Sequence, residues 1–275
     1  MQKKLVTNLV LFFILLVLIG LILSGKDKND SYIPLTEVNK DNISEITIYR
    51  ENQNIVLTKK NNVWRMTQPL NVLANEFRVK TLLALLNTNI DKQYNIDEVD
   101  LKTYGLQPPR AHIQFDQTHI YFGKTSPVNA MRYLQVNNKM YLLFDELYPL
   151  VSSQPTSFVD LSLLPQNAAI KNITLPDMQL IKSANSWNTK PENIADADQI
   201  QTLLQNWRYA KAFAVHHIME RKTLGNIIIE LENKQTIKFK ITDTSPWLIL
   251  ARTDLNIEYH LDISQKEKLL SFTKP

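Results

Sequence analysis

An uncharged apolar run near the amino end constrains this chain more than any other feature. Residues Leu5–Leu23 read LVTNLVLFFILLVLIGLIL, with Thr7 and Asn8 as the polar members. As a helix rising 1.5 Å per residue, these 19 residues extend about 28 Å, close to the hydrocarbon thickness of a bilayer. A cleavable signal peptide would end in a small-x-small site, which Leu-Ile-Leu-Ser-Gly is not, and a buried core helix would carry one polar face. We therefore expect an uncleaved, single-pass membrane anchor.

The lysines that flank this run predict its orientation. Lys3 and Lys4 precede it, and Lys26 and Lys28 follow it. The charge bias is small, but a short amino tail with two lysines is typical of a signal anchor. We expect the amino terminus in the cytoplasm and residues 26–275 outside it. In a bacterial cell this means the inner (cytoplasmic) membrane, with the carboxy-terminal domain in the periplasm.

Composition excludes several classes of chemistry. The sequence has no cysteine, which removes disulfides, thiolate metal sites, iron–sulfur clusters and cysteine nucleophiles. Its 5 glycines are too dispersed for a phosphate-binding loop. The net charge is +4, and lysine and arginine form no run of the kind that nucleic-acid binders carry. We expect no nucleic-acid partner.

Beyond a polar tether at residues 26–41, one hydrophobic pattern occurs twice. Alternating apolar residues predict strands, and apolar residues at helical spacing predict one helix over about 75–90, N-capped by Asn75, and a second over about 196–214. Short matches recur in the same order at offsets of roughly 115–125 residues. They include Trp64 with Trp187, Thr81-Leu82-Leu83 with Thr202-Leu203-Leu204, and the endings Tyr141…Asp145 with Tyr259…Asp262.

This pattern predicts an α+β fold with an internal duplication. The expected order is a cytoplasmic tail and transmembrane helix at 1–25, the tether at 26–41, a first repeat at 42–165 and a second repeat at 166–275. Each repeat is expected to be a mainly antiparallel β unit with one packed helix, because the strands come in hairpin-like pairs rather than singly between helices. Strands are predicted at His112–Phe115, His119–Phe122, Arg132–Val136, Met140–Phe144, Thr236–Ile241, Trp247–Ala251 and Glu258–Leu261.

The titratable residues give no recognisable catalytic or metal motif. His216 and Glu220 would share one face if the second helix extended past them, with His217 alongside, but the HExxH spacing and a nearby third ligand are missing. His112 and His119 are interpreted as surface residues of a hairpin. The acidic groups Asp97-Glu98-Asp100 and Asp196/Asp198 lack calcium-loop spacing, and the second group suits a helix N-terminus. We expect no catalytic, cofactor-binding or metal-binding residue, and no enzyme.

The small polar residues and the tryptophans admit structural interpretations. Ser152-Ser153 and Ser162 fall in the predicted linker between the repeats, where such residues are common. Trp64 and Trp187 occupy equivalent predicted strands and are interpreted as core residues, although exposed tryptophans could bind glycan or lipid. Trp207 and Trp247 belong to the second half alone.

A series of signposts resembles one bacterial family. They are Ile46-Thr47-Ile48, Val63-Trp64-Arg65-Met66-Thr67-Gln68-Pro69, Ala74-Asn75 with its leucine-rich helix, Tyr104-Gly105-Leu106-Gln107-Pro108-Pro109, Phe122-Gly123-Lys124 and Arg132-Tyr133. In this order they resemble the domain of unknown function (DUF) 4340 family over about residues 43–260. The resemblance implies an envelope protein with an amino-terminal anchor, in some members associated with auxiliary subunits of ABC transporters, and it transfers no catalytic residue.

Three functions remain open at this point. The favoured one is a non-catalytic, membrane-anchored periplasmic interaction protein, an accessory subunit or scaffold of a membrane complex such as an ABC-type transporter. Its partners would be the lipid bilayer, through Leu5–Leu23, and another membrane or envelope protein. The alternative is a ligand-binding module for lipid, glycan or peptide in the groove between the repeats. An unrecognised enzyme is the third.

Overall fold

The computed structural model describes residues 9–10, 12–20, 33–90, 92–128, 130–184 and 186–272. Residues 9–10 and 12–20 are helical. Among the residues that the structure describes, no helix combines the length and the apolarity that a membrane crossing needs. The remaining positions of the expected anchor Leu5–Leu23, including both of its ends, lie outside the described residues.

The first half of the described chain is built on an antiparallel sheet of nine strands. Their order across the sheet is β4-β3-β2-β1-β6-β7-β8-β9-β5. Each strand predicted in this half is present. The strands are β1 (Glu45–Ile48), β2 (Ile55–Lys60), β3 (Val63–Gln68), β4 (Val72–Leu73), β5 (Gln93–Asn95), β6 (Ala111–Phe115), β7 (Thr118–Thr125), β8 (Met131–Val136) and β9 (Lys139–Phe144).

The second half contains an antiparallel sheet of eight strands within the described residues. Their order is β12-β11-β10-β14-β15-β16-β17-β13. The expected α+β class with two mainly antiparallel sheets is therefore confirmed. These strands are β10 (Ile170–Thr174), β11 (Gln179–Ser183), β12 (Ser186–Lys190), β13 (Ala214–His217), β14 (Gly225–Leu231), β15 (Thr236–Thr244), β16 (Trp247–Arg252) and β17 (Ile257–Asp262).

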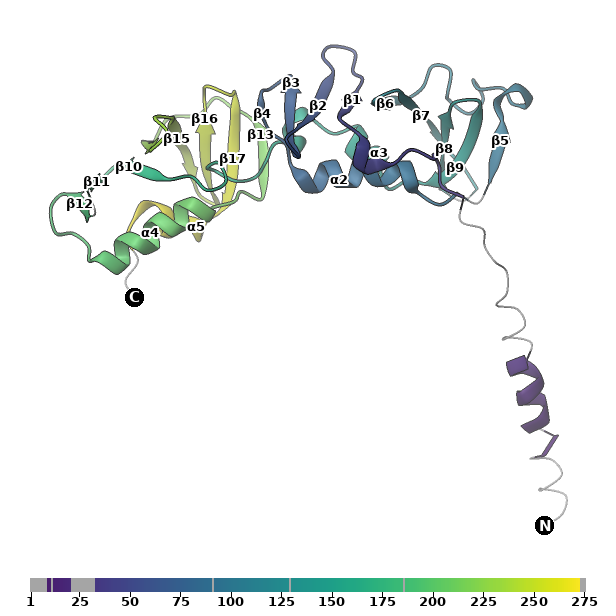
Figure 1. The fold of residues 1–275 in the computed structure, drawn as a ribbon, viewed down its shortest axis with the longest axis horizontal. Coiled ribbons are helices and arrows are strands. Elements are labelled where there is room, and N and C mark those ends of the chain that lie inside the picture. Colours follow the sequence, from purple (N-terminus) through teal and green to yellow (C-terminus); the bar gives the residue numbers. More distant parts are fainter. Residues whose placement is uncertain are drawn as a thin grey trace.

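Both sheets follow the same path once the short edge strand β4 is set aside. In each half, the chain first forms three strands that pair in sequence and then leaves the sheet to form a helix. It returns at the opposite edge of the sheet as β5 or β13, and its next four strands fill the centre in sequence. The helices α2 (Glu76–Ala84) and α4 (Ala197–Tyr209) lie along the same side of their sheets in Figure 1. Trp64 and Trp187 also share a register position, because each lies opposite a lysine in the hairpin that closes the first three strands.

Local capping sets where the two helices begin. The Asn75 side chain accepts a hydrogen bond from the Arg78 backbone N–H at 3.2 Å, as predicted. Asp196 and Gln199 form a capping box, each side chain accepting the other residue's backbone N–H. The short helical segments are η1 (Lys40–Asn42), η2 (Leu85–Asn87), η3 (Ile96–Glu98), α3 (Tyr148–Val151), η4 (Pro155–Phe158) and α5 (Gln265–Leu270).

Both helices end earlier than the sequence pattern predicted. The first is α-helical to Ala84 and then tightens into η2, rather than continuing to residue 90. The second ends at Tyr209 rather than at 214, because the Ala212 backbone N–H donates to the Leu161 carbonyl of the linker instead of to a helical carbonyl. This pairing directs the chain into β13.

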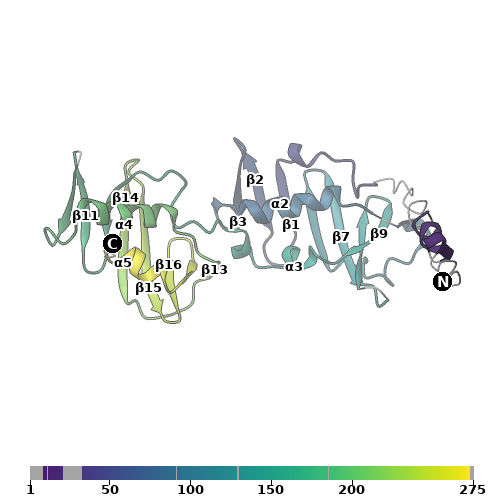
Figure 2. The same ribbon diagram turned by 90° about the horizontal axis from the view of Figure 1, so that it is seen from below.

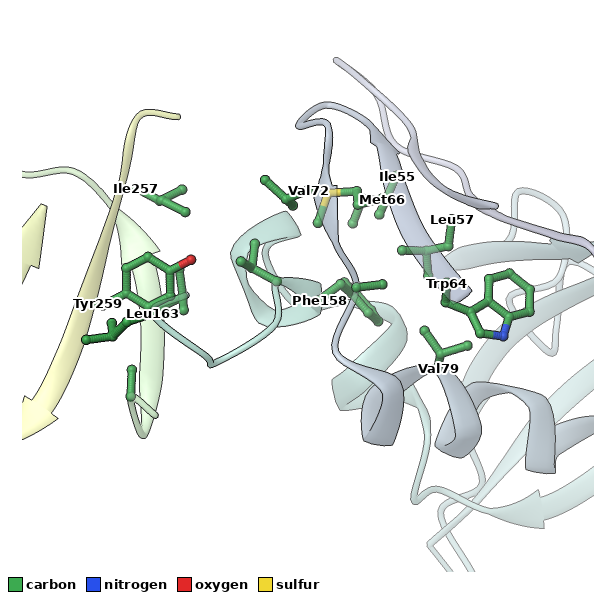
Figure 3. Packing of buried hydrophobic residues seen from close by; sticks show 14 of the residues in the cluster. Ile55, Leu57, Trp64, Met66, Val72, Val79, Phe158, Leu163, Ile257 and Tyr259 are labelled. Atoms are coloured by element: carbon green, nitrogen blue, oxygen red, sulfur yellow. The ribbon is translucent and has the colours of Figure 1, made fainter. Parts of the chain in front are cut away.

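The linker joins the two halves through its own backbone. Phe158 O accepts from Asn75 N–H and Asp160 N–H donates to Leu73 O on the first-half side, while Leu163 N–H donates to Ala210 O on the second-half side. Figure 3 shows Leu163 beside Tyr259 of β17, and Phe158 on the side of the first half. Buried residues of both halves consequently form one hydrophobic cluster. Figures 1 and 2 show the halves end to end along the long axis.

Candidate binding groove at the junction

A groove of about 700 Å³ opens between the first turn of α2, the linker and β13. Phe77 and Arg78 come from α2, and β13 contributes one whole edge. Phe77 is 74% exposed, so its ring is available to a bound molecule. Serine and glutamine side chains of the linker supply hydrogen-bonding groups. The lining residues are Asn75, Phe77, Arg78, Ser153, Gln154, Thr156, Ser157, Leu161, Phe213, Ala214, Val215, His216 and His217.

Exposed rings gather beside β17, at the start of β16 and just before β13. Phe213, directly before β13, is 53% exposed, and Trp247, the first residue of β16, is 45% exposed. Their rings meet edge-on with centroids 5.6 Å apart, and both lie about 6 Å from the ring of His260, which is buried. We call Phe213, Trp247 and Met219, an exposed residue of the loop that follows β13, the junction rim.

A buried polar cluster supports the junction rim. Glu258 of β17 has no exposed surface, and its carboxylate accepts hydrogen bonds from Arg221 Nη1 at 2.7 Å and from the Met219 backbone N–H at 3.1 Å. His260 Nε2 lies 2.8 Å from the other carboxylate oxygen. Burial alone would raise the pKa of Glu258, but these hydrogen bonds and the charge of Arg221 lower it. The carboxylate is therefore held ionised.

The cluster fixes the connection from β13 to β14. β13 lies at the sheet edge and β14 lies inside the sheet, so residues 218–224 must cross β17, β16 and β15. They cross on the face to which Glu258 points, since Met219 and Arg221 bind that carboxylate. The opposite face carries Ile257, Tyr259 and Leu261 into the core. Glu258 is thus covered by a loop rather than by a helix.

The predicted histidine pair does not lie on a helix. His216 and His217 are exposed residues of β13, and Glu220 is an exposed residue of the crossing loop, so the helical face that would have joined His216 to Glu220 is absent from this described segment. His216 instead packs edge-on against His260, with centroids 4.6 Å apart. Burial lowers the pKa of His216, and the charge of His260 lowers it further. Among the described residues, no three histidine, aspartate or glutamate side chains converge as metal ligands.

His112 and His119 lie on the outer face of the first sheet, in strands as predicted. They form part of a ring ladder in which Tyr49 stacks on His112 at 4.0 Å and His112 stacks on Tyr121 at 4.4 Å. His112 Nε2 lies 2.9 Å from His119 Nδ1. Burial in this stack, together with the charge of His119, lowers the pKa of His112 to about 4. The ladder stabilises neighbouring strands, as cross-strand ring pairs do.

The remaining candidates have local structural roles. Asp100 accepts hydrogen bonds from Thr103 and from the Lys102 backbone, which lower its pKa. Asp196 and Asp198 lie at the start of α4. Ser162 donates its backbone N–H to Asp160 in the linker, and Ser152 and Ser153 bond to α3 carbonyls.

The tryptophans divide between the core and the surface. Trp64 is buried, and Trp187 is half-buried against the same core, which agrees with their interpretation as packing residues. Trp207 is fully buried and donates its indole N–H to the Leu269 carbonyl at 2.8 Å. Trp247 alone of the four joins the junction rim.

The family assignment follows from the middle of the chain. The family described as Domain of unknown function (DUF4340) matches residues 64–221, which is more than half of the sequence. The chain belongs to this family. The DUF4340 match is shorter than the expected 43–260, and it begins in β3 and ends at Arg221 of the crossing loop. It thus contains every residue that lines the groove, together with Phe213 and Met219 of the junction rim. No curated protein and no solved structure matches the chain.

Proposed function

We propose that this DUF4340 protein is a non-catalytic interaction protein that binds a protein partner through the junction rim. The observation that carries the proposal is the exposure of Phe213, Trp247 and Met219 around the buried, hydrogen-bonded pair Glu258–His260. Aromatic residues, methionine and arginine are the residue types that protein interfaces favour. Because Glu258 fixes the loop that carries Met219, little of this surface must be ordered on binding.

The apolar run Leu5–Leu23 is proposed to anchor the chain in the inner membrane of a bacterial cell, with the folded halves in the periplasm. Its length and lack of charge support this role. The partner is then a membrane or envelope protein, with the chain acting as an accessory subunit or scaffold of a complex such as an ABC-type transporter. The strand order common to both sheets supports an internal duplication, with repeats at 42–165 and 166–275.

A second candidate function is binding of a lipid, glycan or peptide in the groove. Its volume of about 700 Å³ falls within the range of small-molecule sites. The groove and the junction rim share Phe213. Substitutions at Phe213 therefore cannot distinguish the two functions. They are distinguished by whether the purified protein carries a protein partner or a small ligand.

The decisive experiment is affinity purification of the full chain in mild detergent, followed by mass spectrometry. We expect a membrane protein to co-purify with the wild type and to be lost from Phe213→Ser and Trp247→Ser. Tyr94→Ser is the matched control, since Tyr94 is a 42% exposed aromatic residue on β5, at the far edge of the first sheet. A partner retained by both rim variants would reject the rim as the contact. A chain that carries a small ligand and no partner would support the second candidate.

A further inference from the structure

The described chain enters the fold at the end of the first half that lies away from the junction. Residues 33–36 pair with residues 86–90 after α2: Leu35 N–H donates to Thr88 O at 2.8 Å and Ile90 N–H donates to Ile33 O at 3.0 Å. The Thr36 hydroxyl, which is buried, donates to Leu86 O at 2.9 Å. Figures 1 and 2 show this entry beside β8 and β9. The point at which the anchor must connect is therefore fixed.

Apolar side chains are exposed around this entry. Val128, in the turn that leads into β8, is 91% exposed, Phe144 at the end of β9 is 72% exposed, and Ile33 is 45% exposed. Phe144 lies opposite Met131 in the ladder and lines a hollow of about 290 Å³ together with Asn89, a neighbour of Ile33. We call Ile33, Val128 and Phe144 the entry patch.

The framework beneath the entry patch is rigid. Arg132 of β8 is buried and makes two hydrogen bonds of 2.7 Å to Asp145, the residue that follows Phe144. Its guanidinium also lies 3.7 Å from the centroid of the Tyr148 ring. The charge of Asp145 is thereby neutralised, while Glu146 lines the same hollow as Phe144.

The length of the chain before the entry places this patch near lipid. Nine residues separate Leu23 from Ile33. Even fully extended, at about 3.5 Å per residue, they hold Ile33 within roughly 35 Å of the end of the apolar run. The bilayer is therefore the apolar surface that is always within reach of the entry patch, at the high effective concentration that a short tether imposes.

We propose that the entry patch inserts into the lipid interface of the bilayer that holds the anchor, so that the first half rests on the membrane and the junction faces away from the anchor. The inference relies on the anchoring part of the proposed function. Phenylalanine and aliphatic side chains backed by a polar framework are typical of surfaces that lie in the headgroup–acyl boundary. The contact sets the height and tilt of the junction rim above the membrane.

The test uses the absence of cysteine in the chain. Val128→Cys and, as a control, Tyr209→Cys on α4 of the second half are labelled with an environment-sensitive fluorophore in the full chain. The proteins are reconstituted in vesicles of three parts phosphatidylcholine to one part phosphatidylglycerol, with spin-labelled lipid as quencher. We expect the fluorescence at position 128 to be quenched at least about twofold more than that at position 209. Equal quenching at both positions would overturn the proposal.

A matched pair of substitutions isolates the patch. Phe144 and Phe77 are 72% and 74% exposed, so an aspartate at either position places its charge in solvent rather than in the core. Phe144→Asp should abolish the excess quenching at position 128, and Phe77→Asp should leave it unchanged. Excess quenching that survives Phe144→Asp would reject the patch as the contact. Flotation of the vesicles after a carbonate wash reports the anchor separately: loss of the protein from the vesicles refutes anchoring, whereas retention without excess quenching refutes this inference alone.

Discussion

Glu258→Gln is the most direct test of how the junction rim is supported. The substitution keeps the shape of the side chain and removes its charge. In the wild type, three donors converge on the carboxylate, from Arg221, His260 and the Met219 backbone. A glutamine offers one oxygen, which can still accept from Arg221 and Met219, and one NH₂ group, to which His260 Nε2 can accept only as the Nδ1–H tautomer. The substitution therefore forces a change of tautomer and leaves the Arg221 charge without its counter-charge.

The expected cost follows from burial. Glu258 has no exposed surface, and breaking a buried ion pair by removing one partner costs about 3–5 kcal/mol. The Arg221 side chain is 24% exposed and can turn toward water, which recovers part of that cost. We expect Glu258→Gln to lower the free energy of unfolding by about 2–4 kcal/mol.

Urea unfolding followed by tryptophan fluorescence measures this loss, because Trp247 lies beside His260. The control is Glu232→Gln: Glu232 forms an ion pair of the same length, 2.7 Å, with Lys182, but both side chains are 40% exposed or more. Because solvent screens that exposed pair, it should contribute much less to stability than the buried one. In a double-mutant cycle, Glu258→Gln and Arg221→Gln should couple by more than about 1 kcal/mol. A Glu258→Gln cost no larger than that of Glu232→Gln would refute the account.

Three further outcomes are expected. Because the pKa of His112 is low in the folded protein, the unfolded chain binds a proton at this residue first as the pH falls. The stability that neutral His112 contributes is complete at pH 7 and is lost as the pH falls from about 6.5 to about 4. The stability difference between wild type and His112→Phe, measured by urea unfolding, should therefore change across that interval by roughly 1–2 kcal/mol, after allowance for solvent screening. Trp207→Phe leaves the Leu269 carbonyl without its donor and should cost about 1–3 kcal/mol in the same assay. Asp196→Ala removes the capping box of α4 and should cost about 1 kcal/mol by thermal unfolding, with Asp198→Ala much milder.

Local signals in the sequence predicted where elements begin better than where they end. Asn75 and Asp196 start helices because their side chains bond to backbone groups three residues on, a contact that neighbouring residues alone determine. The end of α4 depends on Ala212 pairing with Leu161, which lies 51 positions earlier. The apolar periodicity could not show this pairing, and so it placed residues 210–214 in the helix.

The same reasoning explains why the buried cluster escaped prediction. Glu258 and His260 alternate with Ile257, Tyr259 and Leu261, a pattern typical of a strand with one solvated face. The structure buries both polar residues because residues 218–224 cross that face. Arg221 is separated from Glu258 by 37 positions, and only the strand order brings them together. The alternating polar residues Glu258 and His260 are the part of the site that the sequence contains, and nothing local marks them as buried.

Equivalent positions of the two sheets show how one scaffold can support two surfaces. Tyr141 and Tyr259 both point into the core and pair with the returning edge strand, β5 or β13. One register position further along, Tyr94 lies opposite Met140 in the first half. At the equivalent position of the second half, His216 lies opposite Glu258. The pair Tyr94–Met140 contains no charge that a loop would have to neutralise. In the second half, the buried carboxylate of Glu258 requires hydrogen bonds from Arg221 and the crossing loop, and the same loop carries Met219 to the junction rim. The edge at the junction is thus backed by the Glu258 cluster, whereas the corresponding edge of the first sheet carries the uncharged Tyr94–Met140 pair. This difference supports our proposal that recognition resides in the second half and membrane contact in the first.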